Sequence, residues 1–143
     1  MINHAHNTRS NLIPCLRYRN APAAIAWLCK AFGFSEHLVV PSEYGGIAHA
    51  QLDCGTGMLM LGSLDEQSAY GKLMRQSDQA GGNTQSVYRV VERVDELYAR
   101  AKAAGAQIVI DIKDEDYSGR GFTCLDLEGH VWSFGSYDPW VEV

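Results

Sequence analysis

His49 is the side chain of this sequence best placed for chemistry, because it lies inside the strand-like run Ala48-His49-Ala50-Gln51-Leu52. An imidazole titrates near neutral pH, so this group could transfer a proton or bind an anionic part of a ligand. A half-buried histidine that is hydrogen-bonded to its strand neighbours gives the same pattern. We therefore take His49 as a candidate for ligand binding and catalysis and leave both interpretations open.

Sulfur and aromatic side chains form a second set of candidates for ligand binding. Met58 and Met60 would make a soft, adaptable wall against an apolar or aromatic molecule, although methionines also fill gaps in cores. Tyr88 could stack on a ligand and hydrogen-bond to it, or serve the fold alone. Trp140 could close a pocket or pack at a dimer interface.

Other chemistries find little support in the spacing of residues. No serine lies in a G-x-S-x-G elbow, and neither a P-loop nor a G-x-G-x-x-G motif occurs. Cys15 and Cys124 have no histidine placed locally to activate them. His4 and His6 form an isolated pair that is a weak metal candidate. We therefore expect no cofactor and no bound metal.

The composition is that of one globular domain over 1–143, with 46% hydrophobic and 20% charged residues. The 12 basic and 17 acidic residues give a net charge of −5. Nucleic-acid binders need a basic surface, so nucleic acid is not expected as a partner. An acidic surface would instead tolerate or attract a cationic small molecule.

The sequence shows no sign of export or of a membrane segment. The residues up to Asn11 are polar and contain no apolar signal core. The longest apolar stretch, 21–34, contains Lys30 and is too short to span a bilayer. The four cysteines are scattered, without C-x-x-C spacing. We expect a cytoplasmic protein with reduced thiols and no membrane partner.

Each half of the chain shows the order strand, helix and three strands. Asn20 and Pro22 are typical of a helix start, and Gly33 of a helix end. The first half is expected to form a strand at 12–18, a helix at 21–33 and strands at 37–40, 47–52 and 58–61. The second half is expected to form a strand at 86–91, a helix at 94–104 and strands at 107–112, 122–127 and 131–134.

The two halves align with an offset of 72 or 73 residues, which indicates a duplicated module. Lys30-Ala31-Phe32-Gly33 corresponds to Lys102-Ala103-Ala104-Gly105, and Leu61-Gly62-Ser63 corresponds to Phe134-Gly135-Ser136. We place the modules at about 11–63 and about 86–137. The linker at 64–85, with a short helix expected within 67–75, is either a lid or a simple tether.

Three stretches resemble the glyoxalase/bleomycin-resistance/dioxygenase (vicinal oxygen chelate) superfamily. They are Tyr117 to Phe122, the run Asp126-Leu127-Glu128-Gly129-His130-Val131-Trp132-Ser133-Phe134-Gly135, and the opening helix that ends in Ala31-Phe32-Gly33-Phe34. The resemblance implies an α+β fold of two tandem βαβββ modules. These would form a curved mixed sheet around a ligand cup, with helices on the outer face and commonly a homodimer.

Metal-dependent members of this superfamily hold the cation with His, Glu or Gln on the first and last strand of each module. The corresponding residues here are poor ligands for a divalent cation: Ile13, Met60, Ser86 and Ser133. The resemblance therefore implies a subgroup without the metal ligands, in which Ser86 and Ser133 are candidates for ligand binding. Glyoxalase I and extradiol dioxygenase reactions, which use that metal as a Lewis acid, are disfavoured.

Strand alternation predicts which side chains share the cup with these positions. The further inward-facing residues are Cys15, Arg17, Met58, Tyr88 and Val131. The helix-covered face would carry Leu12, Leu16, Leu59, Leu61, Trp132 and Phe134. Arg89 also falls on that apolar face, where the sequence gives it no explanation. His130 lies at an expected turn and should face solvent.

Two functions fit these residues. One is a bleomycin-resistance-like protein that binds a small apolar or aromatic molecule in the cup by shape and stacking. The other is a glyoxalase-like lyase or isomerase, metal-independent or with a metal at shifted positions, that uses His49 or Tyr88 for proton transfer. The acidic run at 114–116 and Arg120 would edge the pocket and recognise a cation, or form a solvated turn. A shared fold does not choose between these functions.

Overall fold

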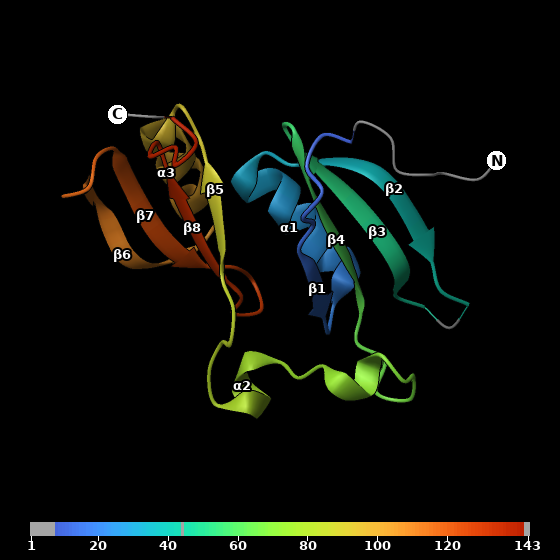
Figure 1. Cartoon of the computed structure of the whole chain (residues 1–143). Helices are drawn as coiled ribbons and strands as arrows, with labels where there is room; N and C mark the ends of the chain where they lie inside the picture. Colours follow the sequence, from blue (N-terminus) through green and yellow to red (C-terminus); the bar gives the residue numbers. More distant parts are fainter. Residues whose placement is uncertain (1–7, 44, 142–143) are drawn as a thin grey trace.

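The computed structural model describes residues 8–43 and 45–141 and contains two βαβββ modules in tandem (Figure 1). The first module comprises β1 (Cys15–Tyr18), α1 (Ala21–Phe32), β2 (Ser35–Pro41), β3 (Ile47–Cys54) and β4 (Gly57–Ser63). The second comprises β5 (Val87–Val90), α3 (Val94–Ala103), β6 (Gln107–Asp114), β7 (Arg120–Leu125) and β8 (Val131–Gly135). The predicted α+β class and tandem modules are confirmed. The candidate pair His4 and His6 lies outside the described residues.

Each module forms its own four-stranded sheet, with the strand orders β1-β4-β3-β2 and β5-β8-β7-β6. The first strand of each module pairs in parallel with the last, and the other pairs are antiparallel. Cys15 is the partner of Met60 in one sheet, and Tyr88 is the partner of Ser133 in the other. These two pairs occupy equivalent places, so the structure confirms the predicted alignment of the halves.

The ends of α1 follow from its local sequence. The Asn20 side chain accepts a hydrogen bond from the backbone N–H of Ala23 at 3.1 Å, and Pro22 occupies the first turn. Gly33 ends the helix in a left-handed conformation, with φ at 74°, and its N–H donates to the Cys29 carbonyl. A residue with a Cβ would be strained at this position. The predicted start and end of this helix are therefore confirmed.

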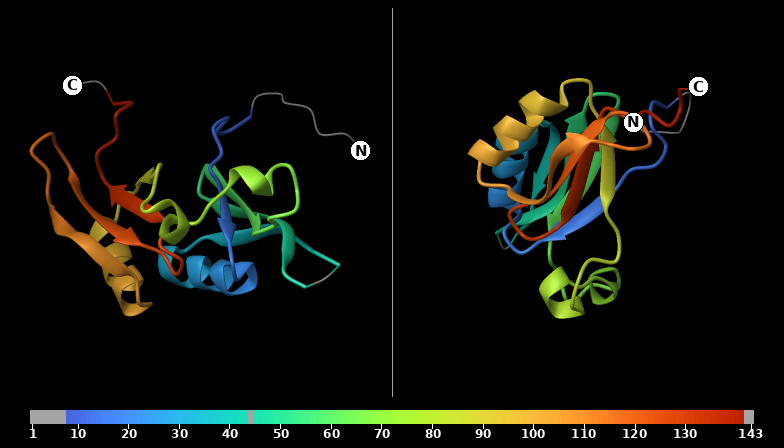
Figure 2. Two further views of the ribbon diagram at one scale, coloured as in Figure 1. Left: turned by 90° about the horizontal axis from the view of Figure 1, so that it is seen from below. Right: turned by 90° about the vertical axis from the view of Figure 1, so that its left-hand side faces the viewer.

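The two long helices lie on the same side of the sheets, as the right-hand view in Figure 2 shows. The apolar face predicted beneath them is buried at Leu59, Leu61, Trp132 and Phe134. Leu16 is partly buried against the same core, and Leu12 is the exception, because its side chain is 84% exposed. The prediction for Leu12 is wrong because β1 begins only at Cys15, so Leu12 precedes the sheet.

Helix α1 also packs against the second module. The ring of Phe32 lies 5.3 Å from that of Trp132 and 4.7 Å from that of Phe134, measured between centroids. Phe34, just beyond the helix, lies 5.6 Å from the Trp132 ring. Burial of these large aromatic groups is a strong apolar contribution to stability, so the modules share one core.

The turn between β7 and β8 holds the start of α1. The Glu128 carboxylate accepts hydrogen bonds from the backbone N–H groups of Arg19 and Asn20, at 2.6 and 2.8 Å. The prediction that His130 faces solvent is wrong. Its ring packs edge-on against Tyr18, and its Nε2 donates to the Arg17 carbonyl at 2.9 Å. The turn therefore joins the two modules.

The connection between the modules contains a 3₁₀ turn, η1 (Gly71–Leu73), and one short helix, α2 (Ser77–Ala80). It passes below both modules in the view of Figure 1. The helix expected within 67–75 is thus reduced to the 3₁₀ turn, and α2 follows it. Among the described residues, no helix has the length and apolar character needed to cross a membrane.

Candidate ligand-binding cavities

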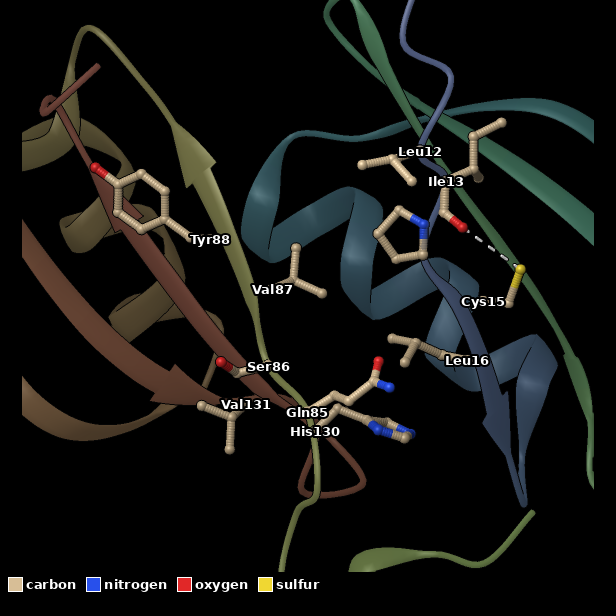
Figure 3. A pocket seen from close by; sticks show the side chains of 11 residues that line it. Leu12, Ile13, Cys15, Leu16, Gln85, Ser86, Val87, Tyr88, His130 and Val131 are labelled. Carbon is tan, nitrogen blue, oxygen red and sulfur yellow. Dashed lines mark hydrogen bonds between the residues drawn. The ribbon is translucent and has the colours of Figure 1, made fainter. Parts of the chain in front are cut away.

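A cavity of about 460 Å³ lies between β1 and β5 (Figure 3). Leu12 and Leu16 on one side and Val87 on the other point toward this gap. Tyr88, by contrast, points away from the gap on the far side of β5. The lining is mostly apolar, and its polar groups come from the side chains of Gln85, Ser86 and His130.

The uncovered face of the first sheet carries a cavity of about 210 Å³ that brings together His49, Met60, Arg17 and Tyr70. Tyr70 belongs to the connection between the modules, and the Arg17 guanidinium lies 4.7 Å from the centroid of its ring. A side-chain nitrogen of Gln51 lies 3.1 Å from His49 Nε2. The structure thus places the candidate His49 beside a cation and an aromatic ring.

The uncovered face of the second sheet carries a cavity of about 290 Å³ lined by Ser133 and three tyrosines, Tyr88, Tyr117 and Tyr137. The Tyr88 hydroxyl donates to the Tyr137 carbonyl at 2.7 Å. Partial burial, followed by the neighbouring Tyr117, raises the pKa of Tyr88, so this phenol is protonated at neutral pH and can donate a hydrogen bond. Ser133 Oγ lies 2.8 Å from the Thr123 hydroxyl.

The acidic loop before β7 forms the rim of this second cavity. Arg120 lines the cavity and forms ion pairs with Asp95 at 3.1 Å and Asp114 at 3.3 Å. Both carboxylates are largely exposed, so these pairs contribute little to stability. The arrangement fits a solvated, charge-balanced turn better than a cation site.

A groove of about 560 Å³ lies where the ends of the two modules meet. Met58, Tyr88 and Trp140 line it, together with Arg89 and Phe34. The Arg89 guanidinium lies over the Phe34 ring, 5.3 Å from its centroid. This contact explains how a cation occupies the otherwise apolar face of β5.

The candidate residues therefore lie in separate cavities of one chain. His49 and Met60 line one, Ser86 another, and Ser133 a third, while Met58 and Trp140 line the groove. Tyr88 lines three of the four cavities. Sequence reasoning missed Tyr70, because its place depends on the path of the connection and no local pattern marks it.

The chain matches the family model of the Glyoxalase/Bleomycin resistance protein/Dioxygenase superfamily over residues 2–134. This chain belongs to that superfamily. An uncharacterized protein of Mycobacterium bovis is 33% identical over 131 residues, which cover 92% of this chain and 86% of the relative. TioX from Micromonospora sp. ML1, whose crystal structure is known, is 33% identical in sequence. The structural match covers 88% of this chain and 97% of TioX, with a TM-score of 0.67.

A superfamily protein from Nocardioides supports the fold alone. It is 16% identical, covers 99% of this chain and 89% of its own, and has a TM-score of 0.67. The superfamily resemblance implies a divalent cation in some members, but the four corresponding residues here do not fit one. Ile13 offers no donor atom, Met60 offers a soft thioether, and Ser133 is engaged with Thr123. Within the described residues, no three His, Cys, Asp or Glu side chains are grouped to hold a metal ion.

Proposed function

We propose that this protein binds a small apolar or aromatic molecule in the superfamily cup, without the superfamily metal. The observation that carries the proposal is the lining of the two uncovered sheet faces. Met60 and Tyr70 line the cavity on the first, and Tyr88, Tyr117 and Tyr137 line the cavity on the second. Thioether and aromatic groups favour binding by shape and stacking. The same cavities also offer polar partners at Arg17, His49, Lys113, Glu115 and Arg120.

A complete cup requires the uncovered face of a first-module sheet to meet the uncovered face of a second-module sheet. Within one chain these faces line separate cavities, and this supports a homodimer. Tyr88 and Ile13 point away from each other on the two sides of the gap between β1 and β5 (Figure 3). Tyr88 and Val90 on β5 are also 43% and 42% exposed. In our proposal, the first module of one protomer faces the second module of its partner, so that each cup contains residues from two chains.

A titration with planar aromatic probes tests the proposal. We expect proflavine, a cation, or 2-naphthamide, which is neutral, to bind with a measurable heat in isothermal calorimetry. Tyr88→Ala should weaken the binding several-fold, since an aromatic contact contributes about 0.5–1.5 kcal/mol. Tyr98→Ala is the matched control, because Tyr98 packs against Phe122 and lines none of the four cavities. Absence of binding to all probes at millimolar concentration would refute the proposal.

The surroundings of His49 favour one alternative function, a metal-independent lyase or isomerase. His49 shares its cavity with Arg17, so an anionic intermediate formed by proton transfer would lie beside a guanidinium. The test is turnover of a found substrate by His49→Gln, which keeps a polar group of similar reach. Unchanged turnover would remove His49 from the mechanism, whereas a loss of about 10²-fold or more would support the enzyme.

A further inference from the structure

Arg89 is a half-buried cation that stacks on Phe34 but that no carboxylate among the described residues neutralises. Within 8–43 and 45–141, no carboxylate forms an ion pair with its guanidinium, and no oxygen accepts a hydrogen bond from that group as oxygens do from other arginines. Burial lowers the pKa of Arg89, and the neighbouring Cys54 opposes this effect only in part. Such a charge is costly unless it is paired.

The guanidinium is held in place by apolar contacts. Its carbon lies 5.3 Å from the centroid of the Phe34 ring, and one terminal nitrogen lies beside Gly55, at the turn between β3 and β4. The guanidinium of the second module therefore lies against residues of the first module. No buried side-chain nitrogen among the described residues lacks a partner, so the Arg89 donors are open to the groove.

The groove around Arg89 is apolar on its walls. Phe34 and Trp132 form its buried side, and Met58 lines it from β4. Leu12 and Trp140 also line the groove and are 84% and 89% exposed, so two large apolar side chains on it have no covering partner. Uncovered apolar groups that gather on a concavity indicate a binding surface.

Two carboxylates also line the groove, those of Glu92 and Asp138. Glu92 lies on the surface beyond β5, and Asp138 accepts a hydrogen bond from the backbone N–H of Trp140 at 2.9 Å. Neither forms an ion pair with Arg89. They therefore leave the fork of guanidinium donors free for an anion from solution.

We propose that this groove is a second binding site, for a small aromatic or apolar molecule that carries a carboxylate. Arg89 binds the carboxylate through its paired N–H donors, which match the geometry of two carboxylate oxygens. The aromatic body lies against Met58 and Trp140. A groove of about 560 Å³ is in the size range of small-molecule sites. The site shares Tyr88 with the proposed cup but is centred on Arg89, which lines neither of the two cup cavities. Its preference for an anion opposes the preference for cations that the net charge of −5 suggests.

The test compares 2-naphthoate with its neutral isostere 2-naphthamide in isothermal calorimetry on the full chain. We expect the naphthoate to bind in the groove at least about tenfold more tightly than the naphthamide. Arg89→Met, which keeps the apolar stem, should remove this preference, and Arg89→Lys should keep part of it. Arg93→Met is the matched control, because Arg93 is exposed, pairs with Glu96 and carries the same charge.

Methyl NMR of the methionines locates the site. The naphthoate should shift the Met58 signal in the wild type and in Arg93→Met but not in Arg89→Met. Equal affinities for the two probes, or an unchanged naphthoate affinity in Arg89→Met, overturn the anion site while leaving the cup intact. If Arg89→Met does not fold, Arg89→Lys carries the test. A preference for naphthoate in Arg89→Lys as large as that of the wild type overturns the proposal, because the paired N–H donors of Arg89 then play no part. A naphthoate that shifts Met60 and leaves Met58 unchanged also overturns it, because the ligand is then in the cup.

Discussion

The Tyr18 hydroxyl donates a hydrogen bond of 2.5 Å to Asp126 Oδ2 and thereby joins β1 of the first module to the turn after β7 in the second. Trp132 Nε1 donates to the same oxygen at 3.0 Å. The other carboxylate oxygen accepts the backbone N–H groups of Glu128 and His130. Burial, and then the charge of Asp126, raises the pKa of Tyr18 well above its usual range. The phenol is therefore protonated at neutral pH and donates this hydrogen bond.

Removal of this hydroxyl should destabilise the protein measurably. We expect Tyr18→Phe to lower the free energy of unfolding by about 1.5–3 kcal/mol, because a buried hydrogen bond to a charged acceptor is lost. Urea denaturation measures this change. Tyr98→Phe is the matched control, since the Tyr98 hydroxyl bonds to Asp111 at the surface and its loss should cost less. Equal losses of unfolding free energy in the two variants would show that the hydrogen bond between the modules stabilises the fold no more than a surface hydrogen bond does.

Cys124 should make the protein less stable in alkali. Burial raises the pKa of its thiol to about 12 from the ordinary value of 9.0. As the pH rises through 9.0, the unfolded chain releases this proton while the folded chain keeps it, so the contribution to stability is full below 9.0 and is lost toward 12. Urea titrations over roughly pH 8 to 10 should show a shallower fall in stability for Cys124→Ala than for the wild type. Identical slopes would contradict the prediction.

Metal binding at the superfamily positions should be absent. Purified without a histidine tag and titrated with Ni²⁺, Zn²⁺, Mn²⁺ or Fe²⁺, the chain should bind no cation stoichiometrically, because Ile13 and Met60 supply no suitable oxygen or imidazole. Calorimetry together with elemental analysis measures this. Tight binding of one cation per chain would make a metal-dependent enzyme the better account.

Mixed dimers test whether two chains build one cup. Met60→Trp should block the cup face of the first module and Ser133→Trp that of the second, so each homodimer should lose probe binding. A purified heterodimer of the two variants should recover one binding site, formed by its two unaltered faces. A heterodimer with no binding site would indicate that each cup lies within a single chain.

Local chemistry made much of the fold predictable. Asn20 and Gly33 mark the ends of α1, and the equivalence of Met60 with Ser133 gives the register of both sheets. Such signals depend on residues close in sequence or on the internal repeat. Leu12 was misplaced because strand alternation gives the side of a side chain and does not give where pairing begins.

The arrangement of the site was less predictable, because it depends on how the modules sit against each other. Strand alternation placed Tyr88 in the predicted cup and the sequence offered His49 as a mid-strand candidate, yet neither signal could show that they line different cavities. The prediction that His130 faces solvent was wrong and Arg89 was unexplained, since their contacts with Tyr18 and Phe34 cross between modules. Contacts between residues so far apart in the sequence leave no pattern in the neighbouring residues.

The most direct test of ligand binding in the cup is methyl NMR of the four methionines during titration with a planar aromatic probe such as 2-naphthamide. Met60 is assigned by Met60→Leu, and Met60 lines the cavity on the first sheet. Our account predicts a saturable shift of the Met60 signal that Tyr88→Ala weakens. A Met60 signal that stays unchanged while the probe binds elsewhere, or no shift of any methionine, would contradict it.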